Sequence, residues 1–133
     1  MANWIFIASL QRFRIHDFIR DFGFVEYLQK NKVQLGDTVY LYITAPYSRV
    51  EYKMVVERVD ISSQDEFDDS SYSLRNSSTT SSPSQKAVRL AYIARVQTDE
   101  LCYKKLTQHG FKASMQSNRR INDETAEYIE SFF

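Results

Sequence analysis

The chain has 133 residues, of which 43% are apolar and 14% aromatic, and its 17 basic and 17 acidic side chains give a formal net charge of zero. This length and apolar content predict one domain spanning residues 1–133 with a single substantial core. The one cysteine, Cys102, excludes an internal disulfide and favours a reducing, cytoplasmic location. No apolar run approaches the roughly 20 residues of a membrane-spanning helix, so we expect no membrane partner.

The zero net charge conceals an uneven distribution. Residues 62–85 hold four acids and one base, so the rest of the chain carries a balance of +3. A mildly basic surface permits contact with a polyanion but does not require it, and an ordinary solvated surface explains the charge equally well.

The first third of the chain predicts a strand followed by a helix. Residues 3–9 are rich in Trp, Ile and Phe, which is typical of a buried strand. Apolar residues at i, i+3, i+4 and i+7 predict a short amphipathic helix over residues 15–22, which Gly23 ends. Residues 24–33 fit either a helical or an extended conformation.

A Gly36-Asp37 turn predicts a strand over residues 38–44. Period-two alternation directs Val39, Leu41 and Ile43 toward the core, and Tyr40, Tyr42 and Thr44 toward a second layer or a ligand groove. Residues 49–61 predict a longer strand, with a bulge near the apolar run at 54–56.

Residues 62–85 interrupt this order. Twelve of these 24 residues are Ser or Thr. Such a segment buries too little apolar area to offset the cost of ordering its backbone, roughly 1–2 kcal/mol per residue. We predict a flexible Ser/Thr-rich insertion between two strands.

The C-terminal part returns to regular structure. Residues 86–97 predict a strand, and Thr98 is a suitable N-cap for a helix that runs to about Gln108. An extended polar segment over 111–121 follows. Asn122 then caps a final helix over 123–133.

Four segments carry a resemblance to a known family. They are the Asn3–Ser9 strand, Tyr27 before Asn31, the Gly36–Tyr42 strand with its Val50–Arg58 partner, and the C-terminal residues Leu106–Ile121. In this order they resemble the EVE domain family of the PUA-like superfamily, which also includes YTH and ASCH domains. The resemblance covers most of the chain outside the Ser/Thr-rich segment.

The resemblance implies an α+β fold, a PUA-like, partly closed β-barrel with flanking helices. It also implies a pocket that takes a flipped, modified base, most often a methylated one, in DNA or RNA. Such domains act as readers beside a nuclease or other effector protein in restriction or defence systems. PUA-like barrels also serve in RNA modification and translation, and a protein-interaction or small-ligand module that has lost base binding is the alternative.

The base-pocket candidates are aromatic side chains and polar side chains at strand ends. An aromatic wall is expected because base–aromatic stacking returns roughly 1–3 kcal/mol per base. Hydroxyl and amide groups can hydrogen-bond a base edge. The candidates are Ser9, Phe24, Tyr27, Asn31, Tyr42 and Thr44. Core packing is the competing interpretation for the three aromatic rings, turn or edge solvation for the two hydroxyl side chains, and a helix C-cap for Asn31.

The phosphate candidates precede the last helix. Gln116, Arg119 and Arg120 lie just before the predicted helix N-terminus, and the Arg guanidinium offers a bidentate fork to phosphate. A solvated pair or a salt bridge to a nearby acid competes with this role. Arg12 and Arg14, which flank Phe13, form a second basic and aromatic strip.

We expect a binding module rather than an enzyme. His16 and His109 have no cysteine or carboxylate cluster at metal-ligand spacing, and no phosphate-binding glycine loop, nucleophile elbow or HExxH occurs. We therefore predict no metal and no cofactor.

Overall fold

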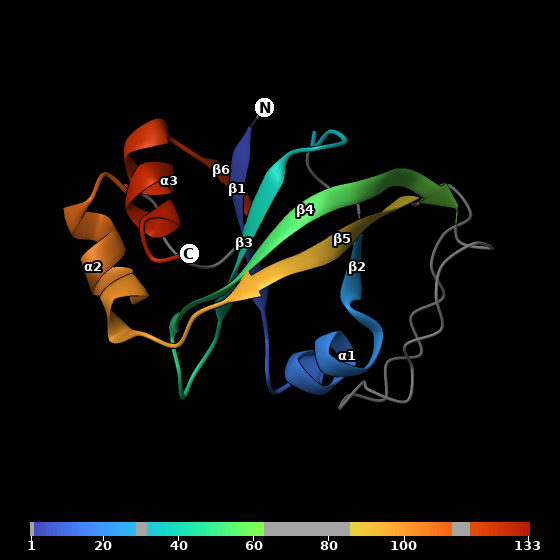
Figure 1. Ribbon diagram of the computed structural model, residues 1–133, viewed down its shortest axis with the longest axis horizontal. Helices are drawn as coiled ribbons and strands as arrows, with labels where there is room; N and C mark the ends of the chain where they lie inside the picture. The colour runs from blue at the N-terminus through green and yellow to red at the C-terminus, as the bar shows by residue number, and fades with distance from the viewer. Residues whose placement is uncertain (1, 29–31, 63–85, 113–117) are drawn as a thin grey trace.

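The computed structural model describes residues 2–28, 32–62, 86–112 and 118–133, and shows one curved sheet with helices against it (Figure 1). The elements are β1 (Asn3–Ala8), α1 (Ile15–Phe22), β2 (Phe24–Leu28), β3 (Thr38–Ile43), β4 (Arg49–Ser62), β5 (Lys86–Arg95), the 3-10 helix η2 (Asp99–Leu101), α2 (Tyr103–Gln108), β6 (Arg119–Ile121) and α3 (Asp123–Glu130). Within these ranges no helix has the length and apolarity needed to cross a membrane. Asn31, Gln116 and the predicted insertion beyond Ser62 lie outside the described residues.

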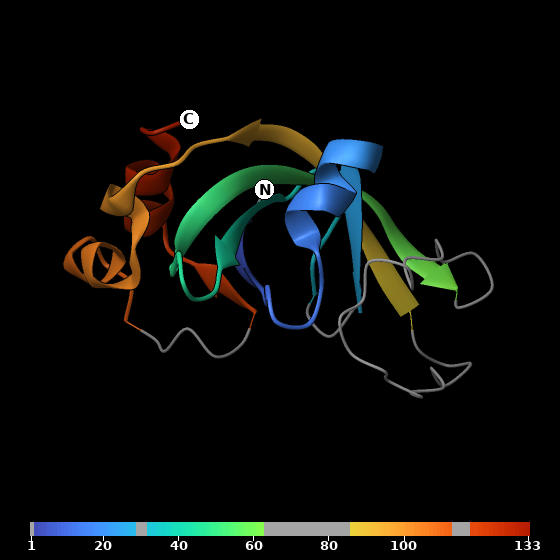
Figure 2. The same cartoon turned by 90° about the horizontal axis from the view of Figure 1, so that it is seen from below.

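The six strands of the described residues form one mixed sheet in the order β2-β5-β4-β3-β1-β6. β1 and β3 are parallel, and each of the other neighbouring pairs is antiparallel. The sheet curves strongly but does not close, because β2 and β6 stand at opposite edges (Figure 2). Register shifts between β4 and β5 on both sides of residues 54–56 confirm the predicted bulge and let this long strand pair bend.

Alternation along β3 divides the apolar interior into two cores. Val39, Leu41 and Ile43 face the α1-side core, which also contains Ile15, Phe18 and Ile19 of α1. Tyr40 and Tyr42 face the α2/α3-side core, which contains Leu101, Leu106, Phe111, Ala126 and Ile129. The predicted inward triplet is therefore confirmed, and the tyrosine face meets a second layer of helices.

Helix α1 forms as predicted. Its apolar stripe packs on the sheet, and Gly23 ends it in the left-handed region at φ 74°, donating its N–H to the Ile19 carbonyl at 2.8 Å. The segment after Gly23, left open by its pattern, is the strand β2. It pairs antiparallel with β5, from Phe24 opposite Ala91 to Leu28 opposite Ala87.

The turn before β3 is built around a buried carboxylate. Asp37 is 3% exposed and accepts hydrogen bonds from the Ala2 N–H, the Trp4 Nε1–H and the Gln34 N–H, each at 3.0 Å. Burial alone would raise its pKa, but the hydrogen bonds outweigh burial and the pKa is lowered. Asp37 thereby fixes the start of β1 against the start of β3.

Both predicted helix N-caps are confirmed, but the helix predicted after the first cap is wrong. The Thr98 hydroxyl accepts from the Glu100 N–H at 3.2 Å, and the Asn122 side chain accepts from the Thr125 N–H at 2.8 Å to start α3. The single helix predicted from Thr98 to Gln108 is wrong, because η2 ends at Leu101 and α2 begins at Tyr103. Cys102 lies between them in extended conformation, and its backbone forms an isolated antiparallel β-bridge with Arg49 of β4.

Candidate nucleic-acid interface

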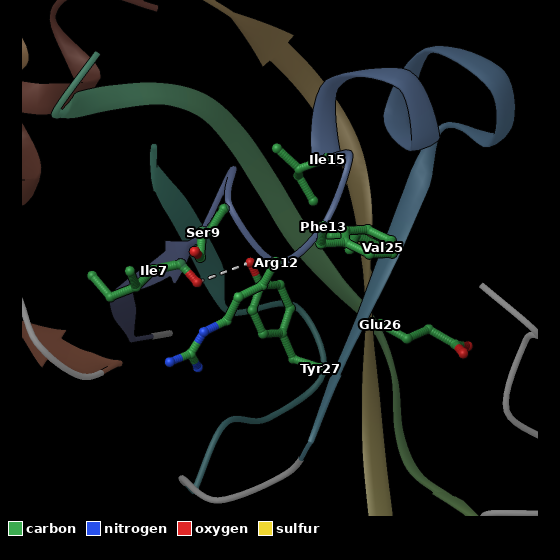
Figure 3. Close-up of a pocket in the computed structure, with 9 residues that line it drawn as sticks. Ile7, Ser9, Arg12, Phe13, Ile15, Val25, Glu26 and Tyr27 are labelled. Carbon is green, nitrogen blue, oxygen red and sulfur yellow. Dashed lines mark hydrogen bonds between the residues drawn. The ribbon is translucent and has the colours of Figure 1, made fainter. Parts of the chain in front are cut away.

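A pocket of about 240 Å³ opens where β1 ends (Figure 3). Its walls come from the end of β1, the loop that leads into α1, and β2. They include Ile7, Ser9, Arg12, Phe13, Val25 and Tyr27. We call this hollow the β1 pocket. Most of its lining is apolar or aromatic, and its polar side chains include Ser9, Arg12 and Glu26, of which Glu26 points away from the other two in Figure 3.

Tyr27 forms one wall and at the same time packs into the fold. Its ring meets Phe6 edge-on, with centroids 5.2 Å apart, and its hydroxyl donates to the Ile7 carbonyl at 3.2 Å, the dashed line in Figure 3. Burial raises the pKa of this phenol, so it stays protonated. The side chain borders the pocket, while its hydroxyl is already engaged.

A tight turn after β1 places Arg12 at the pocket. The Ser9 carbonyl accepts the backbone N–H groups of Arg12 and Phe13 at 3.2 and 3.1 Å. The Arg12 side chain is exposed and extends on the Ile7 side of the pocket in Figure 3. Among the described residues its guanidinium has no hydrogen-bond or ion-pair partner, so its donors are free for an anion.

Of the other base-pocket candidates, Phe24 and Tyr42 lie elsewhere. Phe24 sits under the Arg89 guanidinium, 4.4 Å from its ring centroid, and meets Phe18 edge-on. Arg89 is in turn held by two hydrogen bonds to Glu26, at 2.7 and 2.9 Å. Tyr42 is 6% exposed and packs in the α2/α3-side core. Neither ring lines the β1 pocket.

Thr44 contributes to the pocket indirectly. Its hydroxyl accepts the Leu10 N–H at 3.2 Å, and its N–H donates to the Ala8 carbonyl at 3.1 Å. These bonds tie the end of β3 to the loop that carries Ser9 and Arg12. Asn31, the remaining base-pocket candidate, lies outside the described residues.

Arg119 and Arg120 lie on β6, at the sheet edge next to β1. Arg119 is opposite Ile5 and Arg120 opposite Trp4. Both line a hollow of about 280 Å³ between β6 and the N-terminus of α3. The Asn118 side chain, one residue before β6, accepts the Ile7 N–H at 2.8 Å and so connects this edge to the β1 pocket. Gln116, the third phosphate candidate, is outside the described part of the chain.

Arg12 is the cationic side chain at the β1 pocket. Its sequence offered only a weak signal for a binding role, the Arg-Phe-Arg strip. Its place at the pocket depends on the turn at Ser9, which a sequence pattern does not reveal. Val25 was missed for a related reason, because its wall position follows from β2 being a strand.

The strand order, the parallel β1–β3 pair and the helices on both faces define an α+β domain built on one mixed sheet. Human THYN1, solved in complex with DNA containing 5-methylcytosine, superposes with a TM-score of 0.67 at 10% identity, over 98% of this chain and 96% of its own. ASCH from Zymomonas mobilis gives 0.64 at 11% identity, over 98% and 94%. A protein from Pseudomonas putida gives 0.67 at 16% identity, over 98% and 99%.

The chain therefore has the PUA-like fold of EVE and ASCH domains, as the sequence resemblance predicted. Sequence comparison with protein-family models and with curated proteins gives no match. At identities of 10 to 16% the structural likeness establishes the fold, and function has to be argued from the site.

Proposed function

We propose that this protein is a nucleic-acid reader that takes a modified, methylated base, flipped out of its strand, into the β1 pocket. The observation that carries the proposal is an apolar and aromatic pocket with an uncommitted guanidinium beside it. Its 240 Å³ lies below the roughly 300–1,000 Å³ of pockets for drug-sized ligands, which suits one base. THYN1, of the same fold, was solved with 5-methylcytosine DNA, which supports a nucleic-acid partner.

The residues that line the β1 pocket offer different kinds of contact to a base. The Tyr27 and Phe13 rings supply stacking surface, worth roughly 1–3 kcal/mol per base, against a flipping cost of a few kcal/mol. Val25 offers apolar contact to a base methyl group. The Ser9 hydroxyl has no hydrogen-bond partner among the described residues, so it can form a hydrogen bond with a base edge.

We assign contacts to the phosphate backbone to Arg12 and to the arginines of the neighbouring sheet edge. Arg12 flanks the pocket, and the Asn118–Ile7 hydrogen bond places the Arg119-Arg120 strand beside it. Phosphate contacts position a nucleic acid without reading its sequence, so the pocket supplies the discrimination. The mechanism is recognition without chemistry, and cleavage or signalling belongs to a separate effector protein.

Fluorescence anisotropy tests this proposal directly. Labelled oligonucleotides of one sequence, as duplexes and single strands of DNA and RNA, carry 5-methylcytosine, N6-methyladenine or no modification. We expect tighter binding to one modified form, and weaker binding as salt rises, because phosphate contacts release counterions. Absence of binding to every oligonucleotide at low salt would contradict the proposal and favour a protein-interaction or small-ligand module.

Arg12→Ala isolates the residue beside the pocket. We expect about tenfold weaker binding and a salt slope reduced by about one, with stability unchanged. Arg58→Ala is the matched control, because Arg58 is an exposed guanidinium on β4 opposite Arg89 and outside the β1 pocket. Equal losses from the two variants would show a diffuse charge effect rather than a contact at this pocket.

A further inference from the structure

A second hollow, of about 400 Å³, lies between α1 and the β4–β5 pair. Its lining includes His16, Arg20, Tyr52, Tyr92 and Arg95. We call it the β4–β5 pocket. Ile15 lines the β1 pocket and the next residue, His16, lines this one, so the start of α1 separates two distinct sites.

A buried carboxylate underlies this pocket. Glu51 is fully buried and accepts a hydrogen bond from Arg49 at 3.1 Å. The His16 Nε2 and one Arg95 nitrogen lie 3.6 and 3.9 Å from its second oxygen, which has no hydrogen-bond partner among the described residues. A buried charge of this kind persists only where cations compensate it. The guanidinium groups of Arg49 and Arg95 supply these cations, and the His16 ring lies beside the same carboxylate.

His16 is a neutral part of this arrangement. Burial, together with the nearby Arg95, lowers its pKa from 6.5, against the opposing effect of Glu51. The Tyr52 hydroxyl lies 2.5 Å from His16 Nδ1. With the imidazole neutral, Tyr52 donates to Nδ1 and the ring proton sits on Nε2, facing Glu51. The cluster is thus fixed before any ligand arrives.

Arg95 is oriented toward the pocket but has spare donors. Its guanidinium lies over the Tyr52 ring at 5.1 Å from the centroid, and only one nitrogen approaches Glu51, beyond hydrogen-bond distance. In the described part of the chain it makes no side-chain hydrogen bond. Arg20, the other guanidinium, is already paired with Asp17 and Asp21, at 3.2 and 3.1 Å. An anion in this pocket would therefore bind Arg95.

Tyr92 supplies the aromatic surface opposite. It is 44% exposed, and its ring centroid lies 6.2 Å from that of Tyr52, edge to face. Its outer face is open to a planar partner. An open ring face beside a pre-oriented guanidinium matches a planar ring that carries an anionic group.

We propose that the β4–β5 pocket is a second ligand site, for a nucleotide unit whose base stacks on Tyr92 and whose phosphate binds Arg95. The hollow exceeds the β1 pocket, 400 against 240 Å³, in keeping with a ring and its sugar-phosphate rather than a base alone. A free mononucleotide and one nucleotide of a bound strand present the same chemistry. This site does not depend on base flipping into the β1 pocket.

The test uses free nucleotides and oligonucleotides in parallel. Adenosine and cytidine 5′-monophosphates, the matching nucleosides and inorganic phosphate are titrated by calorimetry and by amide NMR shifts. Unmodified single strands are titrated by anisotropy. Tyr92→Ala is compared with Tyr103→Ala, a control that removes another exposed tyrosine, on α2, whose ring also meets a neighbouring ring edge-on. Arg95→Lys keeps the charge near Glu51 but removes the planar fork.

We expect Tyr92→Ala and Arg95→Lys each to weaken binding by at least about fivefold, while Tyr103→Ala leaves it unchanged. Shifted amides at Tyr92 and Arg95 with a monophosphate, but not with the nucleoside, identify a free nucleotide as the ligand. Losses seen only with the oligonucleotide, equal for modified and unmodified strands, identify a nucleotide of the strand. If neither probe responds to either variant, the proposal is overturned, while discrimination of modified bases by the β1 pocket is judged separately through Arg12→Ala.

Discussion

Two pairs of tyrosines on the two faces of the sheet differ in what packs over them. On the α2/α3 side, Tyr40 and Tyr42 are 2% and 6% exposed and belong to a closed core. On the α1 side, Tyr27 and Tyr92 line the two aromatic-walled pockets and keep part of their rings accessible. A tyrosine-rich strand is therefore not by itself a binding surface, because the layer packed on it decides whether its rings are accessible.

The hollow on the α3 side shows the same contrast. It lies against Tyr40, Lys53 and Glu130, and these side chains are bonded to one another, because the Tyr40 hydroxyl donates to Glu130 at 2.6 Å and Lys53 pairs with the same carboxylate. These three polar side chains are therefore already bonded within the protein. The α1-side pockets instead leave Arg12 and Arg95 with donors to spare.

The largest effect should come from Tyr42→Ala. Removing this buried ring from the α2/α3-side core should lower the free energy of unfolding by about 3 kcal/mol, measured by urea denaturation. Affinity of the folded protein for nucleic acid should not change. Tyr103→Ala, at an exposed ring, should stay within about 0.5 kcal/mol. Lost binding with intact stability would place Tyr42 in the ligand site and contradict its assignment to a closed core.

Tyr40→Phe tests the satisfied polar group on the α3 side. Loss of its hydrogen bond to a carboxylate should cost about 1.5 kcal/mol of unfolding free energy. Burial works against ionisation of Glu130, but hydrogen bonds from Lys53 and Tyr40 keep its pKa below 4.5. In the variant that pKa should rise toward 4.5, as followed by NMR titration. An unchanged titration would show that Lys53 alone sets it.

Tyr27→Phe separates the ring of a pocket tyrosine from its hydroxyl. The lost bond to the Ile7 carbonyl should cost about 1 kcal/mol of stability, while oligonucleotide affinity should stay within about twofold because the wall remains. Tyr27→Ala should weaken binding by fivefold or more. Equal affinities for all three proteins would remove Tyr27 from the base pocket and leave it a packing residue.

The smallest effect is a pH dependence from the α1 side. The pKa of His16 is lower in the folded protein than its ordinary 6.5, so the unfolded chain binds this proton more readily. The contribution of His16 to the free energy of unfolding should therefore be fully present above about pH 6.5 and should be lost as the pH falls below that value. His16→Gln should flatten this decline in urea titrations between pH 7.5 and 5.5. A decline that persists in the variant would assign it to another group.

Local patterns determined much of this protein. The apolar stripe set α1, and Gly23 ended it because a left-handed residue costs glycine little. The alternation in β3 divided the two cores, and Thr98 and Asn122 capped the segments that follow them. Each of these signals acts within a few residues, through hydrogen bonds or side-chain periodicity, so the sequence alone was sufficient.

Long-range pairing decided the rest. Residues 24–28 form the strand β2 because β5, about sixty residues further along the chain, pairs with them in antiparallel fashion. The burial of Asp37 and Glu51 followed from donors and cations brought in by other elements, Trp4 for the first and Arg95 for the second. The positions of α1, α2 and α3 on the sheet likewise decided which tyrosines are accessible to a ligand, because a side chain's exposure depends on what packs over it.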